Sequence, residues 1–166
     1  TDLSGVWTRH ELIVWAPWAT PSSGGLYDPD DDKWRPMSLE GAPGRRQHPA
    51  VVWTGDEMLV WGGFGPDSDH PADGGRFDPV DNSWSSMATK NGPGARQRAS
   101  AVWTGERMLI WGGYSPEDPG STQLVPQSSG AAYDPETDSW VTMPSTNAPS
   151  ARAAAVTIWT GHRMIV

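Results

Sequence analysis

Three arginines recur along the chain, each seven residues before a tryptophan: Arg46, Arg96 and Arg152. A guanidinium group presents a rigid fork of N–H donors that suits a carboxylate or a phosphate. Further polar side chains flank these positions, namely Arg45, Gln47, Gln97 and Arg98. The pattern predicts a ligand-binding surface for an acidic group. The alternative, which we slightly favour, is that each arginine bridges backbone carbonyls or pairs with a carboxylate of the neighbouring repeat.

Three aromatic residues occupy corresponding places just after apolar runs: Trp18, Phe64 and Tyr114. An aromatic ring at the mouth of a loop can stack on a sugar or a peptide. We therefore add these residues to the candidate ligand-binding set, although packing in the core explains each of them more simply.

Other residue types give little support for catalysis or metal binding. The loop 66–73 gathers Asp67, Asp69, His70 and Asp73, but their spacing does not match a calcium loop of the EF-hand kind. A solvated acidic loop is the simpler interpretation. The other histidines are isolated from the partners of a catalytic triad or a zinc site, and the chain has no cysteine. We expect no catalytic residue, metal or cofactor.

The elements that position these side chains come from an internal repeat. The segment W-T-G-D-E-M-L-V-W at 53–61 has gapless counterparts at 7–15, 103–111 and 159–166. An aromatic-Asp-Pro triplet begins at residues 27, 77 and 133, and a tryptophan follows seven residues later each time. The next hairpin tryptophan always comes 19 residues further on. Only one interval varies, from the end of the first segment to the aromatic, over 12, 16 and 22 residues.

Local chemistry predicts four strands in each unit and no helix. In the second unit, residues 50–53 and 58–61 are apolar and β-prone around a Thr-Gly turn. Gly62 and Gly63 end the second strand, where a backbone approaches closely or takes a positive φ. Residues 75–78 and 83–87 form the third and fourth strands around a turn that contains Pro, Asp and Asn. The prediction is an all-β fold.

The pattern Arg, apolar strand, Gly-Gly, Tyr/Phe-Asp-Pro and Trp resembles the kelch repeat, whose four-stranded blades form β-propellers. The resemblance implies a partial blade at 1–40, blades at 41–90 and 91–145, and a partial blade at 146–166. It also implies that arginines near these positions bind acidic peptides. The motif W-T-G-x-x-M-x-V-W-G-G is similar to that of bacterial kelch proteins, many of which are exported. The resemblance therefore favours an extracellular or periplasmic location. The first unit departs from the pattern, with Ala16-Pro17-Trp18 in place of Gly-Gly-aromatic and Arg9-His10 in the turn.

About three blades cannot close a ring, because propellers have four to eight. We expect either a slice of a larger propeller, which we favour, or copies that associate to complete one. In antiparallel blades the variable connection emerges on the same side as the segment that carries the arginines. Insertions of repeat proteins collect on the binding side, so this side is the predicted binding surface.

Composition narrows the function classes. The net charge is −8 and no run of Lys and Arg occurs, which argues against a nucleic-acid-binding function. No apolar stretch is long enough to span a membrane. The function that we predict is a scaffold that binds a protein, peptide or glycan. The alternatives are part of a propeller enzyme that acts on sugars, similar to sialate isomerases, and a purely structural spacer. The resemblance to copper radical oxidases fails because their Tyr–Cys crosslink needs a cysteine.

Overall fold

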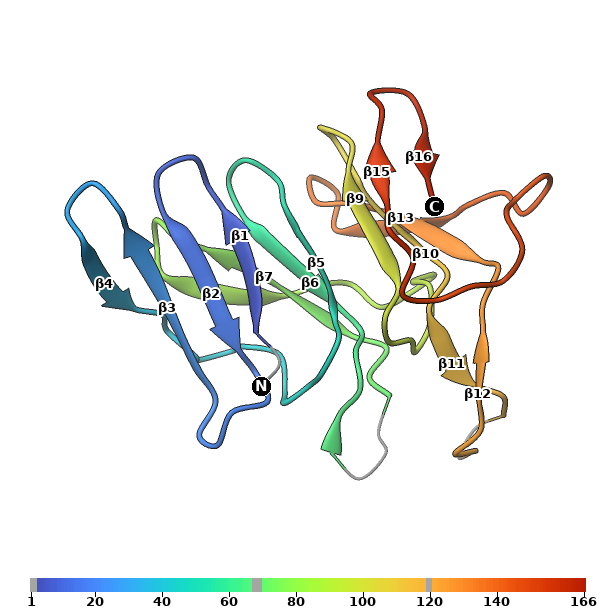
Figure 1. The fold of residues 1–166 in the computed structure, drawn as a ribbon, viewed down its shortest axis with the longest axis horizontal. Helices are drawn as coiled ribbons and strands as arrows, with labels where there is room; N and C mark the ends of the chain where they lie inside the picture. The colour runs from blue at the N-terminus through green and yellow to red at the C-terminus, as the bar shows by residue number, and fades with distance from the viewer. Residues whose placement is uncertain (1–2, 67–69, 119–120) are drawn as a thin grey trace.

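The computed structural model describes residues 3–66, 70–118 and 121–166, and it is built from β-strands (Figure 1). Sheet 1 consists of β1 (Ser4–Trp7), β2 (Leu12–Ala16), β3 (Ser23–Asp28) and β4 (Lys33–Pro36). Sheet 2 consists of β5 (Ala50–Trp53), β6 (Met58–Trp61), β7 (Gly74–Asp78) and β8 (Ser83–Ser86). Sheet 3 consists of β9 (Ser100–Trp103), β10 (Met108–Trp111), β13 (Gly130–Asp134) and β14 (Ser139–Thr142).

Two further pairs of strands complete the structure. The pair β11 (Tyr114–Pro116) and β12 (Leu124–Pro126) forms inside the longest variable connection, and β15 (Ile158–Trp159) pairs with β16 (Met164–Ile165) near the end of the chain. All strand pairs are antiparallel, so the all-β prediction is confirmed. Sheet 1 carries all four strands, whereas the sequence predicted only part of a blade over residues 1–40. The three sheets do not close into a ring (Figure 1).

The first two strands of each sheet are joined by a threonine-based turn. In sheet 2 the backbone N–H of Thr54 donates to Glu57 O at 3.0 Å, and the Thr54 hydroxyl accepts the N–H of Glu57 at 2.9 Å. Gly55 completes this turn at a φ of 116°. Arg9 takes the corresponding place in sheet 1 at a φ of 84°, a backbone conformation that residues other than glycine rarely adopt. The threonine contacts therefore hold the same turn without the glycine.

The hydrophobic core lies between the sheets, because successive side chains of a strand point to opposite faces. In sheet 2, Met58, Val60, Phe77 and Trp84 pack with Trp15 and its neighbours in sheet 1. The alternate residues Leu59 and Trp61, with Met87, pack with Ile110, Tyr133 and Trp140 in sheet 3. Sheet 2 thus forms one wall of each core, and removing either neighbouring sheet would expose one of its faces.

The first strand of each sheet lies innermost. The strands β1, β5, β9 and β15 contact one another in sequence order. Backbone hydrogen bonds connect the segments that precede them: Arg98 N donates to His48 O at 3.1 Å, and Ala154 N donates to Arg98 O at 2.9 Å. These three residues have φ values of 51° to 53°. The segments that carry the predicted arginines therefore follow the inner side of the stack.

The Gly-Gly pairs allow successive sheets to approach closely at this inner side. Gly63 N donates to Arg96 O at 2.8 Å, and Gly113 N donates to Arg152 O at 2.9 Å. Gly62 has a φ of 65°, and a Cβ atom there would lie 2.5 Å from Arg96 O. Glycine is required on both counts. Sheet 1 has Ala16-Pro17 instead, and Pro17 has no N–H to make the corresponding bond.

Candidate ligand-binding surface

The variable connections and the arginine-bearing segments lie at the same end of the sheets, at the bottom of Figure 1. We call this end the loop surface; it consists of the described residues of the connections 17–22, 37–49, 62–73, 87–99, 112–129 and 143–157. The opposite end, the hairpin surface, consists of the turns 8–11, 29–32, 54–57, 79–82, 104–107 and 135–138. The variable connections and the arginine-bearing segments therefore lie on one surface, as the antiparallel strand order predicts.

The guanidinium group of Arg46 is turned into the protein, with the residue only 1% exposed. Its Nε donates to Gly44 O at 2.9 Å and its Nη1 to Gly62 O at 3.0 Å. Its Nη2 donates to the carboxylate of Asp73 at 2.9 Å. Arg46 therefore ties the segment before β5 to both ends of the variable connection of its own sheet. The carboxylate partner belongs to the same sheet, whereas the structural alternative from the sequence placed it in the adjacent one.

Arg96 makes the equivalent contacts in sheet 3 without an ion pair. Its Nη1 donates to Gly112 O at 3.0 Å and to Ser129 O at 2.9 Å, and its Nη2 donates to Pro93 O. Ser129 stands where sheet 2 has Asp73, and among the described residues no carboxylate pairs with Arg96. Burial without a compensating charge lowers the pKa of Arg96 to about 10.

Arg152, the third member of the series, is half-buried. Its Nε donates to Ser150 O at 3.0 Å and its Nη2 to the Ser150 hydroxyl at 3.0 Å. Its Nη1 lies 3.3 Å from Val166 O. All three recurring arginines thus donate hydrogen bonds to nearby backbone carbonyls. Arg46 and Arg96 are also buried, so little of either side chain is accessible to a ligand.

Arg45, next to the buried Arg46, is exposed and lies against the aromatic side chains of the loop surface. Its Cζ atom is 5.0 Å from the centre of the Trp18 ring, and its Nη2 donates to Trp18 O at 3.1 Å. The Trp18 ring stacks on Phe64 at 6.4 Å between centroids, and Phe64 meets His70 edge-on at 5.2 Å. We call Arg45, Trp18, Phe64 and His70 the aromatic row. It joins the loops of sheets 1 and 2.

Gln47, Gln97 and Tyr114 are placed by short antiparallel bridges. Gln47 exchanges backbone hydrogen bonds with Phe64 at 2.7 and 2.8 Å, and Gln97 exchanges them with Tyr114 at 2.9 and 2.8 Å. Gln97 is buried, while Gln47, Phe64 and Tyr114 are half-buried. The sequence placed these residues in one candidate ligand-binding set without pairing them. The bridges bring each glutamine together with an aromatic residue at the start of the variable connection.

Arg98 is exposed on the inner side and contacts His48 of sheet 2. Its Nη2 lies 2.9 Å from His48 Nε2. A guanidinium group can only donate, so the imidazole accepts through Nε2 and carries its proton on Nδ1. The two residues occupy equivalent positions of successive repeats, so a polar pair also joins the inner sides of sheets 2 and 3 at the loop surface.

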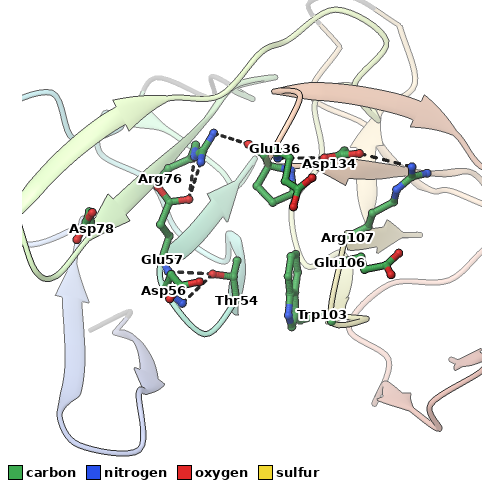
Figure 2. Close-up of a pocket in the computed structure, with 12 residues that line it drawn as sticks. Thr54, Asp56, Glu57, Arg76, Asp78, Trp103, Glu106, Arg107, Asp134 and Glu136 are labelled. Carbon is green, nitrogen blue, oxygen red and sulfur yellow. Dashed lines mark hydrogen bonds and ion pairs between the residues drawn. The ribbon is translucent and has the colours of Figure 1, made fainter.

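The hairpin surface contains cavities between neighbouring sheets that the sequence did not indicate. The larger one, of about 710 Å³, lies between sheets 2 and 3 with Trp103 in its wall (Figure 2). A second one of about 490 Å³ lies between sheets 1 and 2. Charged side chains line the larger cavity: Asp56, Glu57, Arg76, Asp78, Glu106, Arg107, Asp134 and Glu136.

Arginine contacts also cross between sheets at this hairpin surface. Arg76 donates to Glu57 at 2.7 Å and to Pro135 O of the next sheet at 2.9 Å. Arg35 does the same with Glu11 at 2.8 Å and Pro79 O at 2.9 Å. Hydrogen bonding to the hairpin glutamate raises the pKa of Arg35. These arginines therefore stabilise the junctions between sheets.

The structure brings no metal-ligand set together within the described residues, where no group of three or more His, Asp or Glu side chains could hold an ion. Asp73 of the acidic loop pairs with Arg46, while Asp67 and Asp69 lie outside the described residues. No helix in the described part of the chain is long and apolar enough to cross a membrane.

A comparison with protein families matches residues 7–166 to the KLHDC2/KLHL20/DRC7 Kelch-repeats domain. The chain belongs to the kelch-repeat family. Each four-stranded sheet is therefore a kelch blade, and the family assignment extends over nearly the whole chain, including the first unit with its altered turn. Among curated proteins, none matches the chain.

Kelch domains commonly bind proteins, which agrees with the coarse prediction of a binding module. The sequence missed the cavities of the hairpin surface because the Asp-Pro and Thr-Gly turns suggested structure alone. One signal was present: the residue before the apolar run of the hairpin is charged in every unit, as Glu11, Glu57, Arg107 and Arg163.

Proposed function

We propose that this kelch domain binds a protein or peptide segment through its loop surface, with the aromatic row as the contact site. The observation that carries the proposal is the stacking of Arg45 on Trp18 and of Trp18 on Phe64 across two blades. Aromatic and arginine side chains are enriched at the centres of protein interfaces, because they combine apolar area with donors. Trp18 and Phe64 themselves lie in the variable connections of the first two kelch blades.

The chemistry of the loop surface favours a ligand segment that carries a carboxylate. Arg45 and Arg98 are the exposed arginines of the predicted set, and each has only part of its fork engaged by Trp18 O and His48. A carboxylate forms short, charge-assisted hydrogen bonds with such a fork. Arg46, Arg96 and Arg152 contribute by holding the connections in place.

The test uses an array of peptides with Glu, Asp or a free C-terminal carboxylate, probed with the whole chain. Peptides that bind are then titrated against the Arg45→Ala and Trp18→Ala variants. Each variant should weaken binding about tenfold or more, which corresponds to the loss of one anchoring contact. The control is Lys33→Ala, which removes one exposed positive charge from the opposite end of sheet 1.

Equal weakening by Lys33→Ala would show that net charge alone governs binding. Unchanged binding in Arg45→Ala and Trp18→Ala would contradict the proposal. In that case turnover of a sugar acid would support the enzyme alternative. If no substitution on the loop surface altered the binding of a partner, the structural spacer would be supported.

A further inference from the structure

The cavity between sheets 2 and 3 at the hairpin surface has an aromatic residue in its wall. Its volume of about 710 Å³ is ample for a side chain of a ligand. Trp103, the last residue of β9, is half-buried: it packs against the hydrophobic core and also lines this cavity (Figure 2). We call this space the Trp103 cavity. Part of the indole ring is therefore accessible from the hairpin surface.

The indole nitrogen of Trp103 differs from those of the tryptophans on the fourth strands. Trp84 Nε1 donates to Ser38 O at 3.0 Å, and Trp140 Nε1 donates to Ala88 O at 2.7 Å. Trp103 Nε1 donates to no acceptor among the residues that the structure describes. Trp84 and Trp140 are thus fully engaged by the packing of the blades, whereas Trp103 retains ring surface and a donor for a ligand.

The second cavity repeats this arrangement between sheets 1 and 2. Its volume is about 490 Å³, and Trp53, the last residue of β5, lies in its wall as Trp103 does in the larger one. Asp56 and Asp78 line both cavities, so the two spaces share the turns of sheet 2. The combination of a tryptophan wall and acidic turns therefore occurs at both junctions between the three sheets.

The lining of the Trp103 cavity is strongly acidic. Six carboxylates and two guanidinium groups line it, so negative charges exceed positive ones by four. Glu57 pairs with Arg76 at 2.7 Å, and Asp134 lies 3.5 Å from Arg107. Both arginines thus already have carboxylate partners, and the excess negative charge resides on the remaining side chains.

Three of the remaining carboxylates have no positively charged partner. Asp56, Glu106 and Glu136 are exposed, and none forms an ion pair with a residue in the described part of the chain. They come from both sheets, since Asp56 lies in the turn after β5, Glu106 in the turn after β9 and Glu136 in the turn after β13. Carboxylates and an aromatic ring that line one cavity together attract a cation.

We infer that the Trp103 cavity binds the cationic side chain of a basic protein segment, a guanidinium or an ammonium group. The cation packs on the Trp103 ring, whose π face attracts it, and the unpaired carboxylates accept its hydrogen bonds. A neutral sugar does not offset the excess of negative charge, and an acidic group adds to it. The cavity lies at the end of the sheets opposite the aromatic row, so the inference is independent of the ligand proposed above.

The first experiment measures the charge requirement of the ligand. The whole chain is titrated into a fluorescein-labelled peptide of alternating glycine and arginine, and binding is followed by fluorescence anisotropy at low ionic strength. The matched peptide carries citrulline, which has nearly the shape of arginine without its charge. We expect the arginine peptide to bind about tenfold more tightly or better. Equal affinities would overturn the inference and would indicate a neutral polar ligand such as a glycan.

The second experiment tests the aromatic wall without changing the net charge. Trp103→Leu should weaken the binding of the arginine peptide about fivefold, as expected for the loss of a cation–π contact. Trp103→Phe keeps a ring and should lose less affinity. Thermal unfolding followed by circular dichroism shows that each variant is folded. Unchanged affinity in folded Trp103→Leu would overturn the inference.

Substitution of the exposed carboxylates tests the cavity without disturbing the core. Glu106→Gln combined with Glu136→Gln should weaken the binding of the arginine peptide about tenfold at low ionic strength. The control is Glu40→Gln combined with Glu117→Gln, which removes two exposed carboxylates from the loop surface. Equal weakening by the two pairs of substitutions would overturn the inference, because net charge alone would then govern binding.

Discussion

Arg46 and Asp73 form an ion pair of 2.9 Å between a nearly inaccessible guanidinium group and a carboxylate at the surface. The pair joins the segment before β5 to the residue before β7, so it closes the variable connection of the second kelch blade onto the inner strand. The same guanidinium group also holds Gly62 O, next to the glycine that contacts the third blade. One side chain thus links loop position to blade packing.

Arg46→Ala should destabilise the domain far more than Arg45→Ala. Removing the buried side chain leaves carbonyls of Gly44 and Gly62 without their donor and opens a cavity, which costs about 2–4 kcal/mol. The exposed Arg45 loses one cation–π contact and one hydrogen bond, worth about 1 kcal/mol or less. Urea unfolding followed by circular dichroism measures both. Similar losses for the two variants would contradict the structural role of Arg46.

Ser129→Asp should stabilise the third blade. It places a carboxylate beside Arg96 at the position that Asp73 occupies beside Arg46. A partner for a buried charge is expected to contribute about 1 kcal/mol and to return the pKa of Arg96 from about 10 toward its ordinary value. The midpoint of urea unfolding at neutral pH should rise relative to the wild type. Ser129→Asn, which adds volume without charge, is the control and should leave the midpoint nearly unchanged.

Gly62→Ala should be more damaging than Gly94→Ala, although both glycines have positive φ values of 65° and 77°. The added Cβ at Gly62 would lie 2.5 Å from Arg96 O, while nothing lies within 4 Å at Gly94. Gly94→Ala therefore costs only backbone strain, about 1–2 kcal/mol. Gly62→Ala adds the displacement of the third blade, and thermal unfolding should show at least twice the loss of stability. Equal losses would mean that the inter-blade contact is loose.

Much of this architecture could be predicted from the repeat. The Gly-Gly pair that ends the second strand, the Thr-Gly turn and the common side of the long connections follow from fixed spacings, and the structure contains each of them. The orientation of Arg46 could not be predicted, because its partner Asp73 lies across the one connection whose length varies. No fixed spacing relates the two residues.

The arginine–glutamate contacts at the hairpin surface could not be predicted from the sequence for a different reason. Arg35 lies in β4 and Arg76 in β7, so they do not align in the repeat. They nevertheless reach equivalent glutamates, because neighbouring strands carry cross-strand partners to the same face of a sheet. Sequence alignment compares positions along the chain, whereas the contact depends on position in space.

Asp138→Asn should remove a part of the acid sensitivity of the domain with little cost at neutral pH. Hydrogen bonds from Tyr133 and Ala88 N lower the pKa of Asp138 below its ordinary value of 3.8. A group whose pKa is lower in the folded state stabilises the fold above its unfolded pKa, and the contribution is lost as the pH falls through the folded value. Asn82 serves the same position in the second blade, so an amide oxygen there still accepts the backbone N–H. The free energy of unfolding, measured with urea at pH 7, should change by less than about 1 kcal/mol. Between about pH 5 and pH 2, the range in which carboxyl groups titrate, the variant should lose less stability than the wild type.

Parallel curves of stability against pH for the two proteins would contradict this role of Asp138. The control is Asp30→Asn, which removes an exposed carboxylate from the turn of sheet 1 and should leave the curve unaltered.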